Sequence, residues 1–423
     1  MNNVSAHRAF SFLRTYGYER VSCSKEERTV AEALLNECTS LGVSAQLEEF
    51  TVPCGRVSHA LLRVTSPYVK EYEVTGYERA ASTPEGGLDT EFLYVENADE
   101  VLLEQAKGKI VLVNGYLNRA TYEKLRKAEA AAILTFTGRT IDRESESDLN
   151  RCKLRETLTE PFGAIPVLNM RAASAAEIVR RGAKTVHIEL TGECYDGTSQ
   201  NVCATIPGMD KAEEVITLGG HYDSVYFSSG VHDNLSGSVI VLELLRYFAA
   251  HPPRRTLRFC WFGSEEQGLL GSKAYVKAHA DELKACVAML NFDVAAPTLG
   301  SNHLVTLATD DALHYVAGVL REAGYGVRAK QDTYSSDCIP FADNGVPAIN
   351  LARFGANGAD YMHNRHDSLK SGYLDEHALD ITLQQGFVLL DRLANAASFP
   401  IKREIAPEIR QKVDEYLFKA KKE

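Results

Sequence analysis

Residues 215–224, VITLGGHYDS, decide the predicted fold: a short apolar run ends in two glycines and is followed at once by a histidine and an aspartate. Four more short apolar runs follow along the chain, at residues 257–262, 287–290, 304–307 and 348–351. Helical patterns lie between some of these runs, at residues 237–250, 272–280 and 312–323. Continuous apolar strands that alternate with helices are typical of a mostly parallel sheet covered on both faces. The sequence therefore predicts an α/β fold, with a mostly parallel mixed sheet sandwiched by helices.

The stretch between residues 57 and 195 has a different texture, with short strand-like runs separated by glycine and proline. Its clearest elements are a strand at 108–113, a helix at 121–131 and a second strand at 132–136. Before this stretch, residues 43–52 alternate in strand fashion up to Pro53. A chain of 423 residues suits two domains. We therefore expect an inserted strand-rich α+β domain at 57–195, and a second domain that combines 1–56 with 196–423.

The composition of the chain limits the classes of partner and the cellular location that are expected for the protein. Hydrophobic residues make up 45% and charged residues 24% of the chain, which is the balance of a soluble globular protein. The formal net charge of -11 argues against nucleic-acid and anionic-membrane partners, because both need clustered lysine and arginine. No signal-peptide pattern is seen, and no apolar run approaches the roughly 18–20 residues of a membrane helix. The nine cysteines are scattered without a C-x-x-C pair, which is typical of reduced thiols and predicts a cytoplasmic protein.

Acidic and imidazole side chains gather just past the predicted strand ends. Four segments carry them there: GGHYDS (219–224), GSEEQG (263–268), NFD (291–293) and, a little beyond its strand, YMH (361–363). A fifth segment, GVHDNLSG (230–237), lies where a loop enters a helix. In open α/β sheets, ligand sites form at the carboxyl ends of the strands. Imidazole nitrogens and carboxylate oxygens bind zinc, and two zinc ions about 3.5–4 Å apart can share one carboxylate. The segments therefore predict a two-zinc site, with one of two adjacent glutamates on metal and the other as general base.

Taken singly, each of these residues also has an ordinary structural role. Asp233 and Asn234 could cap a helix, and the adjacent Glu265 and Glu266 suit the positive end of one. A lone histidine after a strand is more often a hydrogen-bonded structural residue than a ligand. The order of the segments along the chain favours the catalytic interpretation.

The same segments resemble the co-catalytic zinc aminopeptidase and glutamate carboxypeptidase family of clan MH, which also includes glutaminyl cyclases. They come in the family's order and span about residues 215–370. The stretch 57–195, with GKIVLV at 108–113 and FGAIPVL at 162–168, resembles the protease-associated domain that several members carry as an insertion. The resemblance implies a zinc-exopeptidase fold with that domain inserted.

Carried over residue by residue, the resemblance implies the metal ligands. His221 and Asp293 would hold one zinc ion, and Glu266 and His363 would hold the other. Asp233 would bridge the two ions, so the implied cofactor is two Zn²⁺ per chain.

The resemblance also implies the residues that act on the water and on the ligands. Glu265 would be the catalytic base, and Asp223 matches a carboxylate that orients the imidazole of His221. Asn364 follows His363 where the family usually has threonine, which leaves His366 as an alternative ligand. The spacing of His363 to Asp367 matches the family's H-T-x-x-D and favours His363.

Four further residues are candidates for the substrate pocket. Tyr334 and Asp337 lie in or beside a segment similar to the family's S-D-x-x-P-F loop, although Tyr334 stands one residue off the expected tyrosine position. His232 precedes Asp233 where aspartate is frequent in the family, and it could line the pocket. Arg353 is the basic residue that could meet a substrate carboxylate.

The implied activity is removal of the amino-terminal residue of short peptides by a metallo-aminopeptidase. A carboxypeptidase of the glutamate carboxypeptidase type is the main alternative, and it depends on Arg353. A single-zinc glutaminyl cyclase is disfavoured because all five ligands are present. A non-catalytic relative is disfavoured for the same reason.

Overall fold

The computed structural model describes residues 4–143 and 149–419. The chain divides into two compact units, a discontinuous unit formed by Met1–Val52 with Thr198–Glu423 and an inserted unit, Pro53–Gly197. In the described parts of the chain, no helix is both long enough and apolar enough to span a bilayer.

The discontinuous unit is built on a mixed sheet. Its strand order is β13 (Arg328–Gln331), β12 (Gly300–Leu307), β14 (Ala348–Gly355), β11 (Cys286–Phe292), β9 (Lys211–His221), β10 (Arg255–Phe262) and β8 (Thr185–Ile206). The central strands β14, β11, β9 and β10 are parallel to one another. Strand β12 is antiparallel to β14, and β8 is antiparallel to β10. The predicted α/β fold with a mostly parallel mixed sheet is therefore confirmed.

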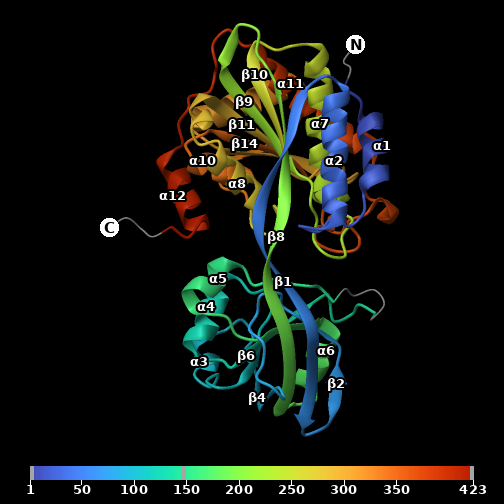
Figure 1. Ribbon diagram of the computed structural model, residues 1–423, viewed down its shortest axis with the longest axis vertical. Helices are drawn as coiled ribbons and strands as arrows, with labels where there is room; N and C mark the ends of the chain where they lie inside the picture. The colour runs from blue at the N-terminus through green and yellow to red at the C-terminus, as the bar shows by residue number, and fades with distance from the viewer. Residues whose placement is uncertain (1–3, 144–148, 420–423) are drawn as a thin grey trace. The chain divides into compact units, whose positions relative to one another are not determined.

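Helices cover both faces of this sheet (Figure 1). One face packs with α1 (Ala6–Tyr16), α2 (Lys25–Ser40), α7 (Ser236–Ala250), α9 (Asp310–Glu322) and α11 (Glu376–Asn395). The other packs with α8 (Leu270–Ala278), α10 (Cys338–Asp343) and α12 (Pro407–Tyr416). Side chains of β10 alternate between the two cores: Leu257, Phe259 and Trp261 lie in the first, and Cys260 and Phe262 lie in the second. Because both faces are buried, the central strands β10 and β11 are apolar at most positions.

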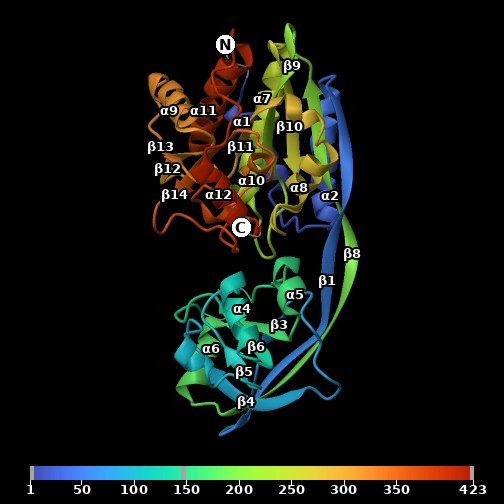
Figure 2. The same cartoon turned by 90° about the vertical axis from the view of Figure 1, so that its left-hand side faces the viewer.

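The inserted unit has its own sheet and its own cores. Its strands are β2 (Lys70–Tyr72), β3 (Val74–Gly76), β4 (Leu88–Tyr94), β5 (Ile110–Leu112), β6 (Ala132–Thr137) and β7 (Val167–Arg171). Its helices are α3 (Glu100–Leu103), α4 (Arg119–Lys127), α5 (Glu156–Phe162) and α6 (Ala172–Arg180). Strands β4 to β7 run parallel in sequence order, with β3 antiparallel to β7 (Figure 2).

Two long strands, β1 (Ser44–Ser66) and β8, contain residues of both units and pair with each other. The prediction that the first of these strands stops before Pro53 is wrong, because β1 continues through it. Strand β1 pairs with β2 only from Leu62 to Val64, so Pro53 lies where β1 is an edge strand. At an edge, a missing backbone N–H need not cost a ladder hydrogen bond.

Two glycines bring α7 close to the strand ends that carry the predicted ligands. A Cβ at Gly237, in the first turn of α7, would lie 2.1 Å from the carbonyl oxygen of Phe292. A Cβ at Gly220, in β9, would lie 3.0 Å from the same oxygen. Only residues without a side chain fit these contacts, so the loop before α7 is held against the ends of β9 and β11.

Candidate metal centre

The structure brings the five predicted ligands together in two groups that share one residue. The first group contains His221, Asp233 and Asp293, and the second contains Asp233, Glu266 and His363. Within each group the ligand atoms lie within 4.8 Å of one another. His221 ends β9, and Asp293 directly follows β11, so the first group forms at the carboxyl ends of neighbouring strands.

The two carboxylate oxygens of Asp233 face different histidines. Its Oδ1 lies 3.2 Å from Nε2 of His221, and its Oδ2 lies 3.0 Å from Nε2 of His363. A second carboxylate lies near the same nitrogen of each histidine: Asp293 at 3.7 Å from Nε2 of His221, and Glu266 at 3.2 Å from Nε2 of His363. Imidazole nitrogens and carboxylate oxygens arranged about one shared carboxylate fit two divalent cations of the zinc type.

The electrostatics of the cluster also fit bound cations. Burial raises the pKa of Glu265 well above its ordinary value; the positive charge of His221 opposes this rise, and neighbouring carboxylates add to it. Burial raises the pKa of Asp337 to about 7. Cations among these groups would stabilise the ionised carboxylates, since an opposite charge at short range favours the charged form.

One buried carboxylate, Asp223, links His221 to the two adjacent glutamates. Its Oδ1 lies 3.3 Å from Nδ1 of His221. The same carboxylate accepts hydrogen bonds from the backbone N–H groups of Glu265, at 3.0 Å, and Glu266, at 3.2 Å. Asp223 therefore contacts both the histidine and the start of the glutamate turn, a geometry that suits the predicted orienting role.

Glu265 lies beside the ligand groups without belonging to either. Its Oε2 is 3.9 Å from Nε2 of His221, and its side chain is 10% exposed. The turn that presents it begins at Ser264, whose φ is +54°, and closes where Gly268 and Leu269 donate to the Glu265 carbonyl oxygen, at 2.8 Å each. A carboxylate fixed in this way can accept a proton from a water molecule among the ligands.

His363 and His366 have different surroundings in the structure. His363 is in the second ligand group, whereas the ring of His366 lies against Tyr361, with 5.5 Å between ring centroids. Asp367, which is fully buried, accepts hydrogen bonds from the backbone N–H groups of His232, at 2.7 Å, and Asp233, at 3.0 Å. The loop that supplies His363 therefore also supports the backbone of the shared ligand.

The pocket candidates Tyr334 and His232 have different surroundings from each other. Tyr334 lies close enough to the ligands that, after burial itself, the charges of Asp293 and Asp233 raise the pKa of its phenol. His232 is fully buried, with Nδ1 bonded at 2.8 Å to the carbonyl oxygen of Ala295, so it supports the loop instead of lining an open surface.

The side chain of Arg353 makes its hydrogen bonds outside the two ligand groups. Its guanidinium donates to the carbonyl oxygens of Pro297, at 2.9 Å, and Thr298, at 3.3 Å, and to Oδ1 of Asn302, at 2.9 Å. These bonds tie it to the segment between β11 and β12. The structure does not group Arg353 with the predicted ligands.

Two buried residues that contact the loops of the site were not predicted from the sequence. Arg20 and Glu27 lie near the start of the chain, and each hydrogen-bonds to segments that carry ligands or the base. No motif marks them as part of the site, because their partners in the site loops are more than 170 positions away in the sequence.

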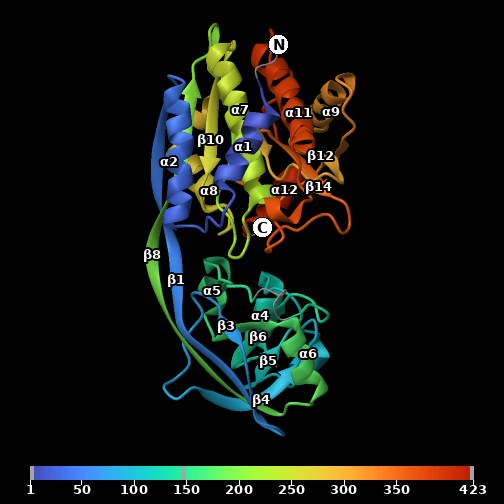
Figure 3. The ribbon, with the colours of Figure 1, turned by 90° about the vertical axis from the view of Figure 1, so that its right-hand side faces the viewer.

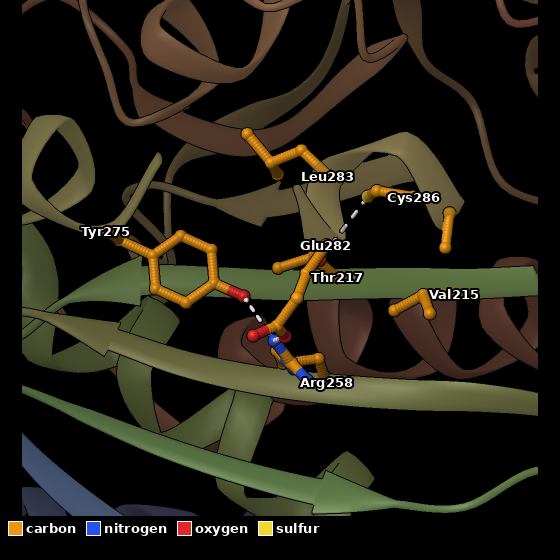
Figure 4. Close-up of a pocket in the computed structure, with 8 residues that line it drawn as sticks. Val215, Thr217, Arg258, Tyr275, Glu282, Leu283 and Cys286 are labelled. Atoms are coloured by element: carbon orange, nitrogen blue, oxygen red, sulfur yellow. Dashed lines mark hydrogen bonds and ion pairs between the residues drawn. The ribbon is translucent and has the colours of Figure 1, made fainter. Parts of the chain in front are cut away.

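A separate cavity of about 170 Å³ lies at the other end of the same strands (Figure 4). Its lining includes Val215 and Thr217 of β9, Arg258 of β10 and Cys286 at the start of β11. The predicted ligands follow the carboxyl ends of these strands, so this cavity is not the metal centre.

The sequence and the fold were compared with those of known proteins. Residues 201–384 match peptidase family M28. Over 409 residues the chain is 26% identical to "Aminopeptidase YwaD" of Bacillus subtilis, covering 93% of this chain and 84% of that protein. It is 27% identical to "Carboxypeptidase Q" of Mus musculus, over 66% of this chain and 62% of that one.

Solved structures match over almost the whole chain. A zinc aminopeptidase from Bacillus subtilis superposes with a TM-score of 0.78 at 21% identity, covering 96% of this chain and all of that one. A peptidase M28 precursor from Shewanella amazonensis superposes with a TM-score of 0.73 at 23% identity, covering 95% of each chain. At these identities the structural matches establish the fold.

Proposed function

We propose, from the match of residues 201–384 to peptidase family M28, that the protein is a zinc-dependent aminopeptidase that removes the amino-terminal residue of short peptides. The observation that carries this proposal is the pair of ligand groups that share Asp233, with Glu265 beside them. The aminopeptidase relative that covers most of the chain supports the direction of cleavage.

The proposed cofactor is two zinc ions per chain. His221 and Asp293 would hold one ion, Glu266 and His363 the other, and Asp233 both. When bound, paired zinc ions supply a water nucleophile at neutral pH and polarise the scissile carbonyl.

The chain's own residues would transfer the proton of the attacking water and stabilise the charge that develops on the substrate oxygen. Glu265 would take the proton of the attacking water on its carboxylate and pass it to the leaving amine. Tyr334 would donate a hydrogen bond from its phenol to the oxyanion, since burial and nearby carboxylates raise the pKa of that hydroxyl and keep it protonated.

The direction of cleavage follows from the charges near the site. A free α-ammonium group can pair with carboxylates there, whereas a substrate carboxylate would be repelled by them. A pair of unit charges at 4 Å interacts with about 4 kcal/mol at an effective dielectric near 20, enough to decide direction. Arg353 is the residue that could attract a substrate carboxylate and so reverse the direction of cleavage. Its guanidinium is instead hydrogen-bonded to Pro297, Thr298 and Asn302.

Acetylating the amino terminus of a good short peptide substrate is therefore expected to abolish its cleavage, because the modification removes the ammonium charge. Amidating the carboxyl terminus of the same peptide is the matched control and should change the rate by less than about threefold. Released amino acids are measured by chromatography. Arg353→Ala should leave the rate on the unblocked peptide largely unchanged.

The main alternative remains a carboxypeptidase of the glutamate carboxypeptidase type, because one relative of the chain carries the name "Carboxypeptidase Q". That alternative requires the reverse result with the blocked peptides, together with a large loss of activity in Arg353→Ala. A single-zinc glutaminyl cyclase would instead show one tightly bound ion in the active protein.

For the inserted unit, we propose a domain of the protease-associated type, as its sequence segments predict. For the location we propose the cytoplasm, a proposal supported by the scattered cysteines, which include no C-x-x-C pair.

A further inference from the structure

The segment that links α1 to α2 lies outside the part of the chain that matches the peptidase family, yet it contacts the loops of the metal centre. Helices α1 and α2 both pack against α7, which follows the Asp233 loop (Figure 3). We call residues 16–27 the amino-terminal brace. Its two charged, fully buried side chains are Arg20 and Glu27.

Arg20 holds both ends of the loop between His221 and Asp233. Its Nε donates to the carbonyl oxygen of Tyr222 at 2.7 Å. Its two Nη atoms donate to the carbonyl oxygens of Ser229, at 2.6 Å, and Gly230, at 2.8 Å. Tyr222 directly follows one predicted ligand and Gly230 lies three residues before another, so one guanidinium fixes the distance between the two stretches of backbone.

The backbone of Arg20 adds to this clamp. Its N–H donates to Oγ of Ser224 at 2.9 Å, and its carbonyl oxygen accepts from the N–H of Ser224 at 3.1 Å. The planar, five-donor geometry of arginine suits several carbonyls at once, which a lysine ammonium cannot reproduce. The hydrogen bonds that Arg20 donates go to carbonyl and hydroxyl oxygens, so its positive charge is left to act on the surrounding carboxylates.

The surrounding carboxylates lie near enough to Arg20 to interact with the charge of its guanidinium. The charges of Asp367, Asp223 and Asp233 all stabilise the charged form of Arg20 against the cost of its burial. By the same interaction, Arg20 offsets part of the repulsion among carboxylates that the metal ligands and their neighbours must tolerate before metal binds.

The other end of the brace holds the turn that presents Glu265. Glu27 accepts hydrogen bonds from the N–H of Ser264, at 3.2 Å, and from the hydroxyl of Ser199, at 2.8 Å. The hydroxyl of Ser22 lies 2.5 Å from that of Ser264. Ser264 is the residue with positive φ that immediately precedes the predicted base.

We infer that the amino-terminal brace positions the metal centre, with Arg20 acting as the positioning residue for the ligands and Glu27 for the base turn. This inference rests on the proposed zinc site. It implies that the zinc affinity and the turnover of the enzyme depend on residues that precede the family match by more than the length of the inserted unit.

The test compares Arg20→Met with Arg255→Met in the full-length protein. Arg255 is a matched control: it is also fully buried and also donates to backbone carbonyls, those of Leu393 and Ala396, but it lies at the start of β10, away from the ligands. Zinc affinity is measured on metal-stripped protein by competition with a chromophoric chelator, and the melting temperature of each variant is recorded beside it.

Arg20→Met is expected to weaken zinc binding by about 10–100-fold, the usual cost of losing a group that orients metal ligands. Arg20→Lys should bind zinc almost as weakly as Arg20→Met, because lysine keeps the positive charge but lacks the planar, five-donor geometry of arginine. Arg255→Met should lower the melting temperature while changing zinc affinity by less than about twofold. Equal effects of the two methionine variants on affinity, or no effect of Arg20→Met, would overturn the inference.

If the Arg20 variants do not fold, Glu27→Gln carries the test. It should lower kcat by about tenfold with KM and zinc content retained, since it disturbs the turn before the base and leaves the ligands in place. An unchanged kcat in Glu27→Gln would overturn the inference. A wild-type protein that takes up no zinc would instead overturn the proposed function, and this inference with it.

Discussion

Asp233→Ala is expected to lose both zinc ions and the peptidase activity together. The two oxygens of Asp233 face the two histidines, at 3.2 and 3.0 Å, so removing one side chain takes a ligand from each group. Each remaining group keeps one histidine and one carboxylate, fewer protein ligands than zinc sites ordinarily have. Metal content by atomic emission should fall from about two equivalents to near zero, since two-metal sites depend on the shared ligand.

Glu243→Ala is the matched control for that variant. Glu243 is another fully buried carboxylate, but it lies on α7 and bonds to Arg8 at 2.8 Å, not to the ligand groups. Its removal should lower the melting temperature and leave the zinc content at the wild-type value. An Asp233→Ala protein that keeps one tightly bound ion and its activity would contradict the two-metal proposal and would favour a single-zinc enzyme.

Glu265→Gln is expected to keep its zinc and to lose turnover. Glutamine preserves the shape of the side chain but cannot accept the proton of the attacking water, so kcat should fall by about 10²–10⁴-fold, the range that general bases supply. KM should change little, because no ligand and no substrate contact is removed. Steady-state kinetics and metal analysis on the same preparation give both quantities.

The adjacent residue provides the control. Glu266→Gln removes a carboxylate that lies 3.2 Å from His363, so it should weaken zinc binding first, and added zinc should restore part of its activity. The opposite pattern, with metal lost from the Glu265 variant and retained by the Glu266 variant, would reverse the proposed order of base and ligand within the pair.

The central strands could be predicted because burial on both faces makes them apolar throughout. The run at 215–218 lies within β9, and the helix expected at 237–250 is α7, Ser236–Ala250. Strand β13 could not be found in this way. Its residues Arg328–Gln331 are largely polar and half exposed, and they are strand only because β12 offers them a hydrogen-bonding partner.

The same contrast applies to the site. The candidate ligands were predictable because each lies in a short motif, after a strand or, for Asp233, where a loop enters α7, and the topology then gathers these segments. The contacts of Arg20 with the loop before α7 could not be predicted, because those carbonyl partners are 202 to 210 positions away and any residue type has a carbonyl. For His363 and His366, the spacing to Asp367 favoured His363, and the structure places His363 in a ligand group.

The division of the discontinuous unit has a consequence for how the chain folds during synthesis. Helices α1 and α2 leave the ribosome first, but most of their packing partners, including α7, are made only after the whole inserted unit. Closing a long loop costs chain entropy that grows slowly with length, by about 0.6 kcal/mol for each doubling. Because β1 and β8 bracket the inserted unit and pair with each other, folding that unit early joins the two ends and shortens the loop that remains. Early folding of the inserted unit would thereby lower the entropy cost of bringing the brace to the metal centre.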